Sequence, residues 1–498
     1  MITIHVGPLT VDEVVRVARG GEPVELGADA LAAMAQSRAV IESLAEDPVP
    51  HYGVSTGFGA LATKHIPLEQ RQQLQRSLVR SHAASSGPEV EREVVRATML
   101  LRLSTLATGR TGVRPLVAQA YADLLNSGVT PVIGEYGSLG CSGDLAPLAH
   151  CALAVMGEGE VRVGDHIVDA GTAVANPVVL QEKEGLALIN GTDGMLGMLS
   201  LALHDLDALL TTADLAAALS VEGLAGTDRV FAADLQALRP HPGQATSAAN
   251  MRAVLEGSGA IAAHATAGFT RVQDAYSLRC APQVHGAARD TVAHARLVAE
   301  RELASAIDNP VVTLDGRVES NGNFHGAPVG YVLDFLAIAV ADVASMSERR
   351  TDRFLDKARN GGLNALLADD PGVDSGHMIA QYTQAAIVSG LKRLAAPASV
   401  DSIPTSAMQE DHVSMGWSAA RKLRRSIDGL QRVLAIEIMT AARGIEMRGE
   451  APAPVSAAVI ARLRDVVPGA GPDRYLAPDI RAAVQLVMDG ALLRASGL

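Results

Sequence analysis

The sequence predicts a mainly α-helical protein with a mixed N-terminal region, and three observations support this fold class. Aromatic residues make up 3% of the 498 residues and hydrophobic residues 48%, so aliphatic side chains must build the core, which suits helix-on-helix packing better than a β-sandwich. From Gly194 to Leu210 the chain is apolar on nearly every helical face, as in a buried helix. Long helical patterns follow, at about 285–306, 328–356, 376–394 and 411–444.

The N-terminal third combines shorter helices with irregular and β-prone segments. Thr10 to Glu13 forms a capping-box motif, which predicts a helix that ends near Gly20. Further helical patterns cover 28–45, 66–82, 90–107 and 115–125. A Gly-rich, irregular stretch over 130–143 precedes a short helix after Asp144, and β-prone pieces within 155–180 predict a minor hairpin.

These patterns divide the chain into three expected parts. They are a mixed N-terminal region over 1–193, a body of long helices over 194–449 and a C-terminal helical tail over 450–498. The tail follows a short linker from Glu450 to Pro454, and Ser456 is expected to cap its first helix.

Composition argues against several classes of function. With 42 basic and 55 acidic residues the formal net charge is −13, and without a basic run this argues against nucleic acid and anionic membrane surfaces as partners. The three cysteines form no disulfide framework, no Cys/His spacing resembles a zinc site, and the HExxH motif is absent. We expect no signal peptide and no membrane span, because Asp334 and Asp342 interrupt the apolar stretch near 329–345 before it reaches about 18 residues. The expected compartment is a reducing cytoplasm.

The stretch from Gly137 to Asp144, GSLGCSGD, is the most informative segment. Taken alone it predicts a tight turn before a helix capped by Asp144, and it matches neither a phosphate-binding loop nor a nucleophile elbow. It also permits a backbone reaction, because the nitrogen of Gly143 is unhindered and a strained turn could press it onto the carbonyl carbon of Cys141. Loss of two waters, one carrying the Ser142 hydroxyl, would leave an exocyclic methylidene. That group is an electrophile, which the ordinary side chains lack.

The longer segment GSLGCSGDLAPLAH resembles the signature of the aromatic amino acid ammonia-lyases and aminomutases. The resemblance implies a 4-methylideneimidazole-5-one group, formed autocatalytically and usually built from Ala-Ser-Gly. Here Cys141 occupies the Ala position, where it would supply only a ring substituent, so we expect the group to form from Cys141, Ser142 and Gly143. We expect no external cofactor and no metal.

Further segments match the same family in family order over nearly the whole chain. They are Tyr52 to Gly59, Ser81-His82-Ala-Ala, Gly185 to Thr192, Gln273 to Cys280, Asn321 to Gly326 and Ser402 to Gly416. The last segment has Met408 where the family usually has Asn, which puts the local hydrogen bonding in doubt.

The resemblance assigns roles to the polar residues of these segments. Tyr52 matches the catalytic base, His82 the position that contacts the substrate ring, and Asn190 a hydrogen-bond donor to the electrophile or to the substrate carboxylate. Phe324 would form a wall of the pocket. Each has a structural alternative: packing for Tyr52 and Phe324, a structural histidine for His82 and a helix cap for Asn190.

Gln273, Tyr276 and Arg279 have the spacing i, i+3, i+6, which predicts that they share one helix face. Arg279 suits a bidentate grip on an α-carboxylate. Tyr276 could orient the electrophile or relay a proton, and Gln273 would help to hold the substrate. The structural alternative for this cluster is a solvated helix face.

Glu410 and His82 indicate the substrate within this family. An acid at position 410 resembles the histidine lyases, whereas the phenylalanine enzymes tend to carry Gln, and a carboxylate can accept a hydrogen bond from an imidazole N–H. The resemblance therefore implies conversion of L-histidine to trans-urocanate and ammonia, in histidine catabolism. Either Tyr52 or Glu410 could take the β-proton.

Two other functions stay open. One is a tyrosine or phenylalanine lyase, or a 2,3-aminomutase, since His82 also fits a tyrosine enzyme. The other is a scaffold of the same fold in which the electrophile never forms.

The family resemblance also implies an architecture and an assembly. The fold would be a central bundle of long helices of the ammonia-lyase and fumarase type. Four copies would form a homotetramer whose active sites draw residues from three subunits. The only other partner expected is a small amino acid substrate.

Overall fold

The computed structural model describes residues 1–47, 49–57, 62, 64–265 and 272–498. These residues form two compact units. The first comprises Met1–His204, Arg296–Asp334 and Pro397–Arg421, and the second comprises Asp205–Ala295, Phe335–Ala396 and Lys422–Leu498. The three consecutive parts expected from the sequence, 1–193, 194–449 and 450–498, stay a prediction, because each compact unit combines segments from several places in the chain.

The first unit begins with a small parallel sheet and a capped helix. Strand β1 (Ile2–Ile4) pairs with β2 (Val24–Leu26). Helix α1 (Val11–Ala18) starts at the predicted capping box, in which Thr10 and Glu13 bond each other's backbone N–H, and it packs against α4 (Arg92–Ala107). Nearly every residue of α4 is buried, including two arginines, so this helix is the core of the unit.

The first unit also contains shorter helices and small sheets, of which α2 (Ala28–Ala45), α5 (Pro115–Ser127), α6 (Leu145–Val155) and β4 (Thr130–Pro131) contact α4. Further short helices are α3 (Arg71–His82), α7 (Ala170–Ala173) and α8 (Glu184–Ala187). The predicted hairpin is present as β6 (Glu160–Val163) and β7 (His166–Asp169), with β4 (Thr130–Pro131) on the other side of β6. Two further antiparallel pairs are β3 (Ser86–Glu89) with β5 (Gly134–Tyr136), and β8 (Val311–Val312) with β9 (Val318–Glu319).

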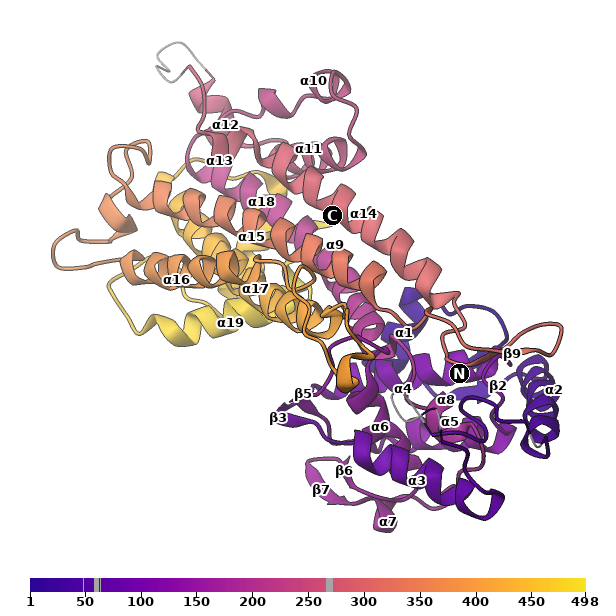
Figure 1. The fold of residues 1–498 in the computed structure, drawn as a ribbon. Helices are drawn as coiled ribbons and strands as arrows, with labels where there is room; N and C mark the ends of the chain where they lie inside the picture. Colours follow the sequence, from indigo (N-terminus) through magenta and orange to yellow (C-terminus); the bar gives the residue numbers. More distant parts are fainter. Residues whose placement is uncertain (48, 58–61, 63, 266–271) are drawn as a thin grey trace. The chain divides into compact units, whose positions relative to one another are not determined.

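Long helices dominate the rest of the chain and confirm the mainly α fold class (Figure 1). They are α9 (Asp193–Gly223), α14 (Ala281–Leu303), α15 (Ala327–Leu355), α16 (Met378–Leu394) and α17 (Gly416–Arg448). Helix α9 is buried along most of its length, as its all-round apolar sequence predicts. Helix α17 begins at Gly416 rather than near 411, because Met415 has φ +53 and interrupts the helical backbone.

In the second unit, α15, α16 and α17 lie side by side (Figure 1). The buried Gln384 of α16 donates to the Val433 oxygen of α17 and to Ser347 of α15. Arg350 of α15 and Glu437 of α17 form a fully buried ion pair. These buried polar contacts link the three helices to one another inside the unit.

Shorter helices complete the second unit. They are α10 (Ala233–Ala237), α11 (Pro242–Leu255), α12 (Gly259–His264), α13 (Tyr276–Arg279), α18 (Pro454–Arg464), α19 (Leu476–Met488) and α20 (Ala491–Ser496). The prediction that Ser456 caps the tail was wrong: α18 begins two residues earlier, with Pro454 in its first turn, and Ser456 is buried inside it.

Helix α15 is long and apolar enough to cross a membrane by length and composition alone, although the sequence prediction excluded it. In the structure, 61% of its apolar window is buried within the protein. Its Asp334 is also buried and accepts the backbone N–H of Ser399 at 2.7 Å. These features are typical of the core helix of a globular protein.

Candidate active site

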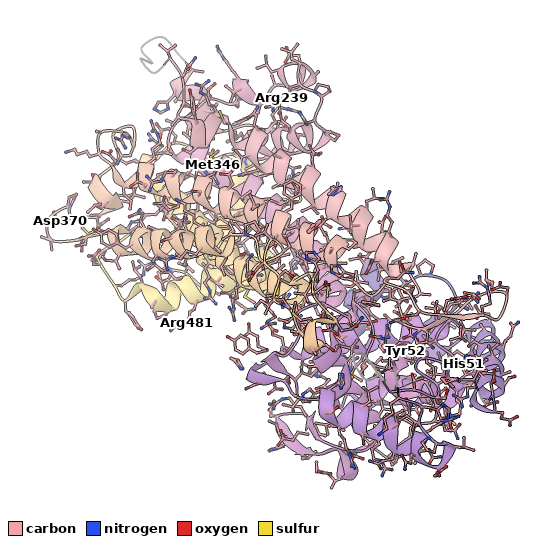
Figure 2. All side chains as sticks on the ribbon, in the orientation of Figure 1. His51, Tyr52, Arg239, Met346, Asp370 and Arg481 are labelled. Carbon is pink, nitrogen blue, oxygen red and sulfur yellow. The ribbon has the colours of Figure 1, made fainter. Side chains whose placement is uncertain are left out.

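The first unit contains a cavity of about 480 Å³ where several predicted site residues meet. Five of them line it: Tyr52, Cys141, Ser142, Phe324 and Glu410. These side chains come from segments far apart in the sequence, and the N-terminal segment contributes Tyr52 (Figure 2). Phe58 and Gly59 of the predicted tyrosine loop lie outside the described residues.

The loop that carries Cys141, Ser142 and Gly143 is held against a second loop by close backbone contact. Gly143 has φ +81 and pairs with Gly191 in an isolated parallel bridge. The N–H of Asp144 donates to the Gly191 oxygen at 2.7 Å. A Cβ at position 143 would lie 2.0 Å from that oxygen, so only glycine fits.

The Asp144 carboxylate connects this loop to helix α9. The prediction that Asp144 caps helix α6 was wrong, because its side chain makes no hydrogen bond to the start of that helix. Instead it accepts the Ser138 hydroxyl at 2.7 Å and the backbone N–H of Met195 at 2.8 Å. Burial raises the pKa of the Asp144 carboxyl to about 7, against the opposing effect of these hydrogen bonds.

Glu410 contacts the loop that carries Cys141, Ser142 and Gly143 through a side-chain hydrogen bond. Its Oε1 accepts the Ser142 hydroxyl at 3.1 Å, and its Oε2 accepts the Thr405 hydroxyl at 2.7 Å. Thr405 and Glu410 are also joined by an isolated antiparallel backbone bridge. Thr405 thus positions the Glu410 carboxylate. The sequence did not single it out, because its hydroxyl bonds Glu410 and does not line the cavity.

Cys141 behaves as a small buried residue rather than as a reactive thiol. Burial, and to a smaller extent the negative charge of Glu410, raise the pKa of its thiol to about 12. A thiolate is the nucleophilic form of cysteine, so this environment suppresses thiol chemistry at the site.

His82 and Asn190 lie next to the cavity without lining it. The Nδ1 of His82, at the end of α3, is 2.9 Å from the Leu78 oxygen, so Nδ1 carries the proton and Nε2 is an acceptor. Burial lowers the pKa of His82, and the bond to Leu78 and the charge of Glu410 oppose this only in part. The side-chain amide of Asn190 donates to the oxygen of Asn309, a cavity residue, at 2.9 Å.

Gln273, Tyr276 and Arg279 lie in the second unit, and the structure does not place them among the residues that line this cavity. The prediction that they share one helix face was wrong for Gln273, because helix α13 contains only Tyr276–Arg279. Within that helix the Arg279 guanidinium lies over the Tyr276 ring, 4.8 Å from its centre.

Several cavity residues were not predicted. They are Ala62, Asn309, Ser320, His325, Gln409, Asp411 and His412. The rings of His325 and His412 are stacked, with their centres 5.6 Å apart. Both histidines occur in segments that the sequence singled out, NGNFHG and QEDH, but only their meeting in space identifies them. Met408, which stands where the family resemblance led us to expect Asn, has an exposed side chain.

Across the described residues, no group of three or more His, Cys, Asp or Glu side chains is arranged to hold a metal ion.

Comparison with known proteins gives a consistent result. A family profile described as aromatic amino acid lyase matches residues 9–465. A histidine ammonia-lyase of Streptomyces avermitilis is 65% identical over 505 residues, covering 100% of this chain and 98% of that protein. A solved tyrosine aminomutase from Streptomyces globisporus has a TM-score of 0.94 at 37% identity, covering 100% of this chain and 98% of that one. The histidine ammonia-lyase from Trypanosoma cruzi has a TM-score of 0.91 at 36% identity, covering 100% and 95%.

Sequence profile, curated relative and solved structures agree over nearly the full length of the chain, in sequence and in fold. Together with the cavity that joins Tyr52, the Cys-Ser-Gly loop and Glu410, they confirm the predicted family. The chain belongs to the aromatic amino acid lyase family.

Proposed function

We propose that this protein is a carbon–nitrogen lyase that converts L-histidine to trans-urocanate and ammonia. The observation that carries the choice of substrate is the position of Glu410, whose carboxylate lies in the cavity within hydrogen-bond distance of Ser142. A carboxylate there can accept an imidazole N–H, whereas a phenyl ring offers no donor. The 65% identity to a histidine ammonia-lyase supports the same substrate.

We propose further that a 4-methylideneimidazole-5-one group forms from Cys141, Ser142 and Gly143. The residues present fit such a group: Gly143 is packed where no Cβ could be accommodated, and the Ser142 hydroxyl faces the cavity beside a carboxylate. Cys141 contributes a small buried side chain with a protonated thiol, which leaves the backbone chemistry unaffected. When formed, the group supplies an electrophilic carbon to which the substrate amine can bind.

The side chains around this position have distinct proposed tasks. Tyr52 removes the β-proton of the substrate, with Glu410 as the rival base. If Glu410 is not the base, it aligns the imidazole by accepting its N–H. The neutral His82 contacts the same ring on its Nε2 side, away from the Nδ1 that is bonded to Leu78. Phe324 forms an apolar wall that helps to keep water out.

The substrate carboxylate requires a cationic partner, and Arg279 is our choice. Gln273, Tyr276 and Asn190 would complete the polar contacts to the substrate and the electrophile. As the family resemblance implies, we propose a homotetramer whose active sites draw residues from three subunits, so that different subunits contribute Tyr52 and Arg279 to one site. The proposed compartment is the cytoplasm, in keeping with three free cysteines, two of them buried.

The experiment that tests this proposal is an ammonia-release assay on the purified protein with L-histidine, L-tyrosine and L-phenylalanine in parallel. Release from histidine alone is the expected result. Absence of release from histidine would overturn the assignment of Glu410 to imidazole recognition.

A tyrosine-acting enzyme is the second candidate, because a solved tyrosine aminomutase shares the fold with a TM-score of 0.94. In that case His82 would bond a phenol. Ammonia release or β-tyrosine formation from L-tyrosine, with no reaction of histidine, would identify this alternative in the same assay.

A further inference from the structure

A buried arginine stands directly behind the loop that presses on Gly143. Arg102, on α4, has no exposed surface. One of its terminal nitrogens donates to the backbone oxygens of Ala187 and Asn190 at 2.9 and 2.7 Å. The other donates to the Ile307 oxygen at 3.2 Å and pairs with the Asp193 carboxylate at 3.0 Å.

These contacts fix the position of Gly191, which lies between Asn190 and Asp193 in the chain. A Cβ on Gly191 would lie 2.3 Å from the Arg102 guanidinium and 2.2 Å from the Asp193 carboxylate. The peptide of Gly191 therefore has no free space on the Arg102 side. The backbone oxygen of Gly191 accepts the N–H of Asp144 and lies close against Gly143.

We propose that Arg102 is a positioning residue for formation of the electrophile, acting through Gly191 as a rigid support against which Gly143 is pressed. The inference rests on the proposed function, because it concerns the group that the function requires.

The step that needs this support is the attack of one amide on another. A bond forms between the nitrogen of Gly143 and the carbonyl carbon of Cys141. The Cys141 oxygen leaves as water with the amide protons of Ser142 and Gly143, and the Ser142 hydroxyl leaves as a second water with the Ser142 Cα proton. An amide nitrogen resists this role because its lone pair is delocalised into the neighbouring carbonyl group, which also keeps the peptide planar. Rigid positioning of the two atoms is thus the main help that the protein can give.

The R102K substitution keeps the positive charge but removes the planar guanidinium, whose several N–H donors bond more than one oxygen at the same time. Gly191 could then retreat from Gly143. A misplacement of about 1 Å can slow a reaction by about 100-fold, so we expect maturation of R102K to slow by about that factor.

Helix α4 offers a matched control. Arg96 is 3% exposed and also donates to backbone oxygens, those of Val17 and Leu125, but has no contact with Gly191. The R96K variant likewise removes a guanidinium from the same helix. It should lose a similar amount of thermal stability and mature like the wild type.

The test measures the mass of the peptide that spans residues 141–143 in full-length wild type, R102K, R96K and G191A. Samples are taken over time after expression, and circular dichroism and thermal unfolding are recorded for each variant. We expect the two-water loss in the wild type and in R96K, and a chain that is folded but largely unmodified in R102K and G191A.

Four outcomes decide the matter. Maturation of R102K at the wild-type rate would overturn the proposal. Equal slowing of R96K and R102K would also overturn it, because maturation would then depend only on the stability of the fold. If R102K does not fold, G191A decides, because its new Cβ displaces the same support, and normal maturation of G191A would overturn the proposal. A wild-type peptide that never loses two waters would instead contradict the proposed function.

Discussion

At the scale of single residues, the two oxygens of the Glu410 carboxylate have different partners: one fixes the side chain in place and the other faces the proposed reaction. Thr405 occupies Oε2, and the Ser142 hydroxyl occupies Oε1. Formation of the proposed electrophile would remove that hydroxyl as water and so free Oε1 for a new donor. The imidazole N–H of histidine is a donor of the right kind, and it would meet a carboxylate already oriented by Thr405.

This leads to a prediction for E410Q. A hydrogen bond to a charged group contributes about 1.5–3 kcal/mol, so we expect kcat/KM for histidine to fall about 10- to 100-fold. Residual turnover of phenylalanine, whose ring offers no donor, should change less. Steady-state kinetics with both substrates measure the ratio, and equal losses would show that Glu410 does not recognise the imidazole.

A second prediction concerns Cys141. Its thiol stays protonated because burial raises its pKa to about 12, and our account gives its side chain no chemical role. We expect C141A to lose two waters from the peptide 141–143 and to retain activity close to that of the wild type. Peptide mass and ammonia release check this, and a mature but inactive C141A would assign the sulfur a function.

The residues that the sequence missed in the cavity share a cause. Motif spacing identified Tyr52, Ser142, Phe324 and Glu410 because they match a family pattern. His325 and His412 are 87 positions apart in the chain, and nothing in the local sequence shows that their rings stack. Arg102 and Thr405 act through other residues, so neither carries a signal of its own.

At the scale of elements, most helices could be predicted because burial imposes a period on the sequence. The capping box before α1 and the all-round apolar stretch of α9 both appear where predicted. The errors arise where a local backbone conformation overrides the pattern. Met415 delays α17 with a positive φ, and only four residues around Tyr276 are helical, although the spacing of three polar residues suggested a longer helix.

Asp144 joins the start of α6 to the start of α9, and this link gives a pH prediction. Burial raises its pKa to about 7, whereas an Asp in an unfolded chain titrates near about 3.9. Between these values the folded state holds a proton that the unfolded state releases, so this group lowers the free energy of unfolding as pH rises from about 4 to 7.

D144N lacks this titration, so the stability of the wild type relative to D144N should decrease between pH 5 and 7. Urea unfolding of both proteins at the two pH values measures the difference. A difference that stays constant, or that moves in favour of the wild type, would contradict the raised pKa.

At the scale of the whole molecule, the two units divide the predicted site residues between them. Tyr52, Ser142 and Glu410 are in the first, and Tyr276 and Arg279 are in the second. The sequence could not assign these groups to one site or to several chains, because assembly depends on surfaces that local patterns do not describe. The family resemblance supplied the tetramer, which stays a proposal.

Complementation tests that proposal. Y52F and R279K should each be nearly inactive alone. If different subunits contribute Tyr52 and Arg279, randomly mixed tetramers of the two variants carry both wild-type residues at about a quarter of their sites and regain activity in proportion. Co-expression with two affinity tags and an activity assay of the mixed species measures this. Absence of recovery would place both residues of each site in one chain.

The measurement that tests the central claim most directly is the simultaneous yield of ammonia and trans-urocanate from L-histidine, for the wild type and for S142A. We predict that the wild type forms the two products in equal amounts and that S142A, which has no hydroxyl to lose, forms almost none. Ammonia without urocanate, or full activity in S142A, would contradict a histidine lyase that builds its electrophile from Cys141, Ser142 and Gly143.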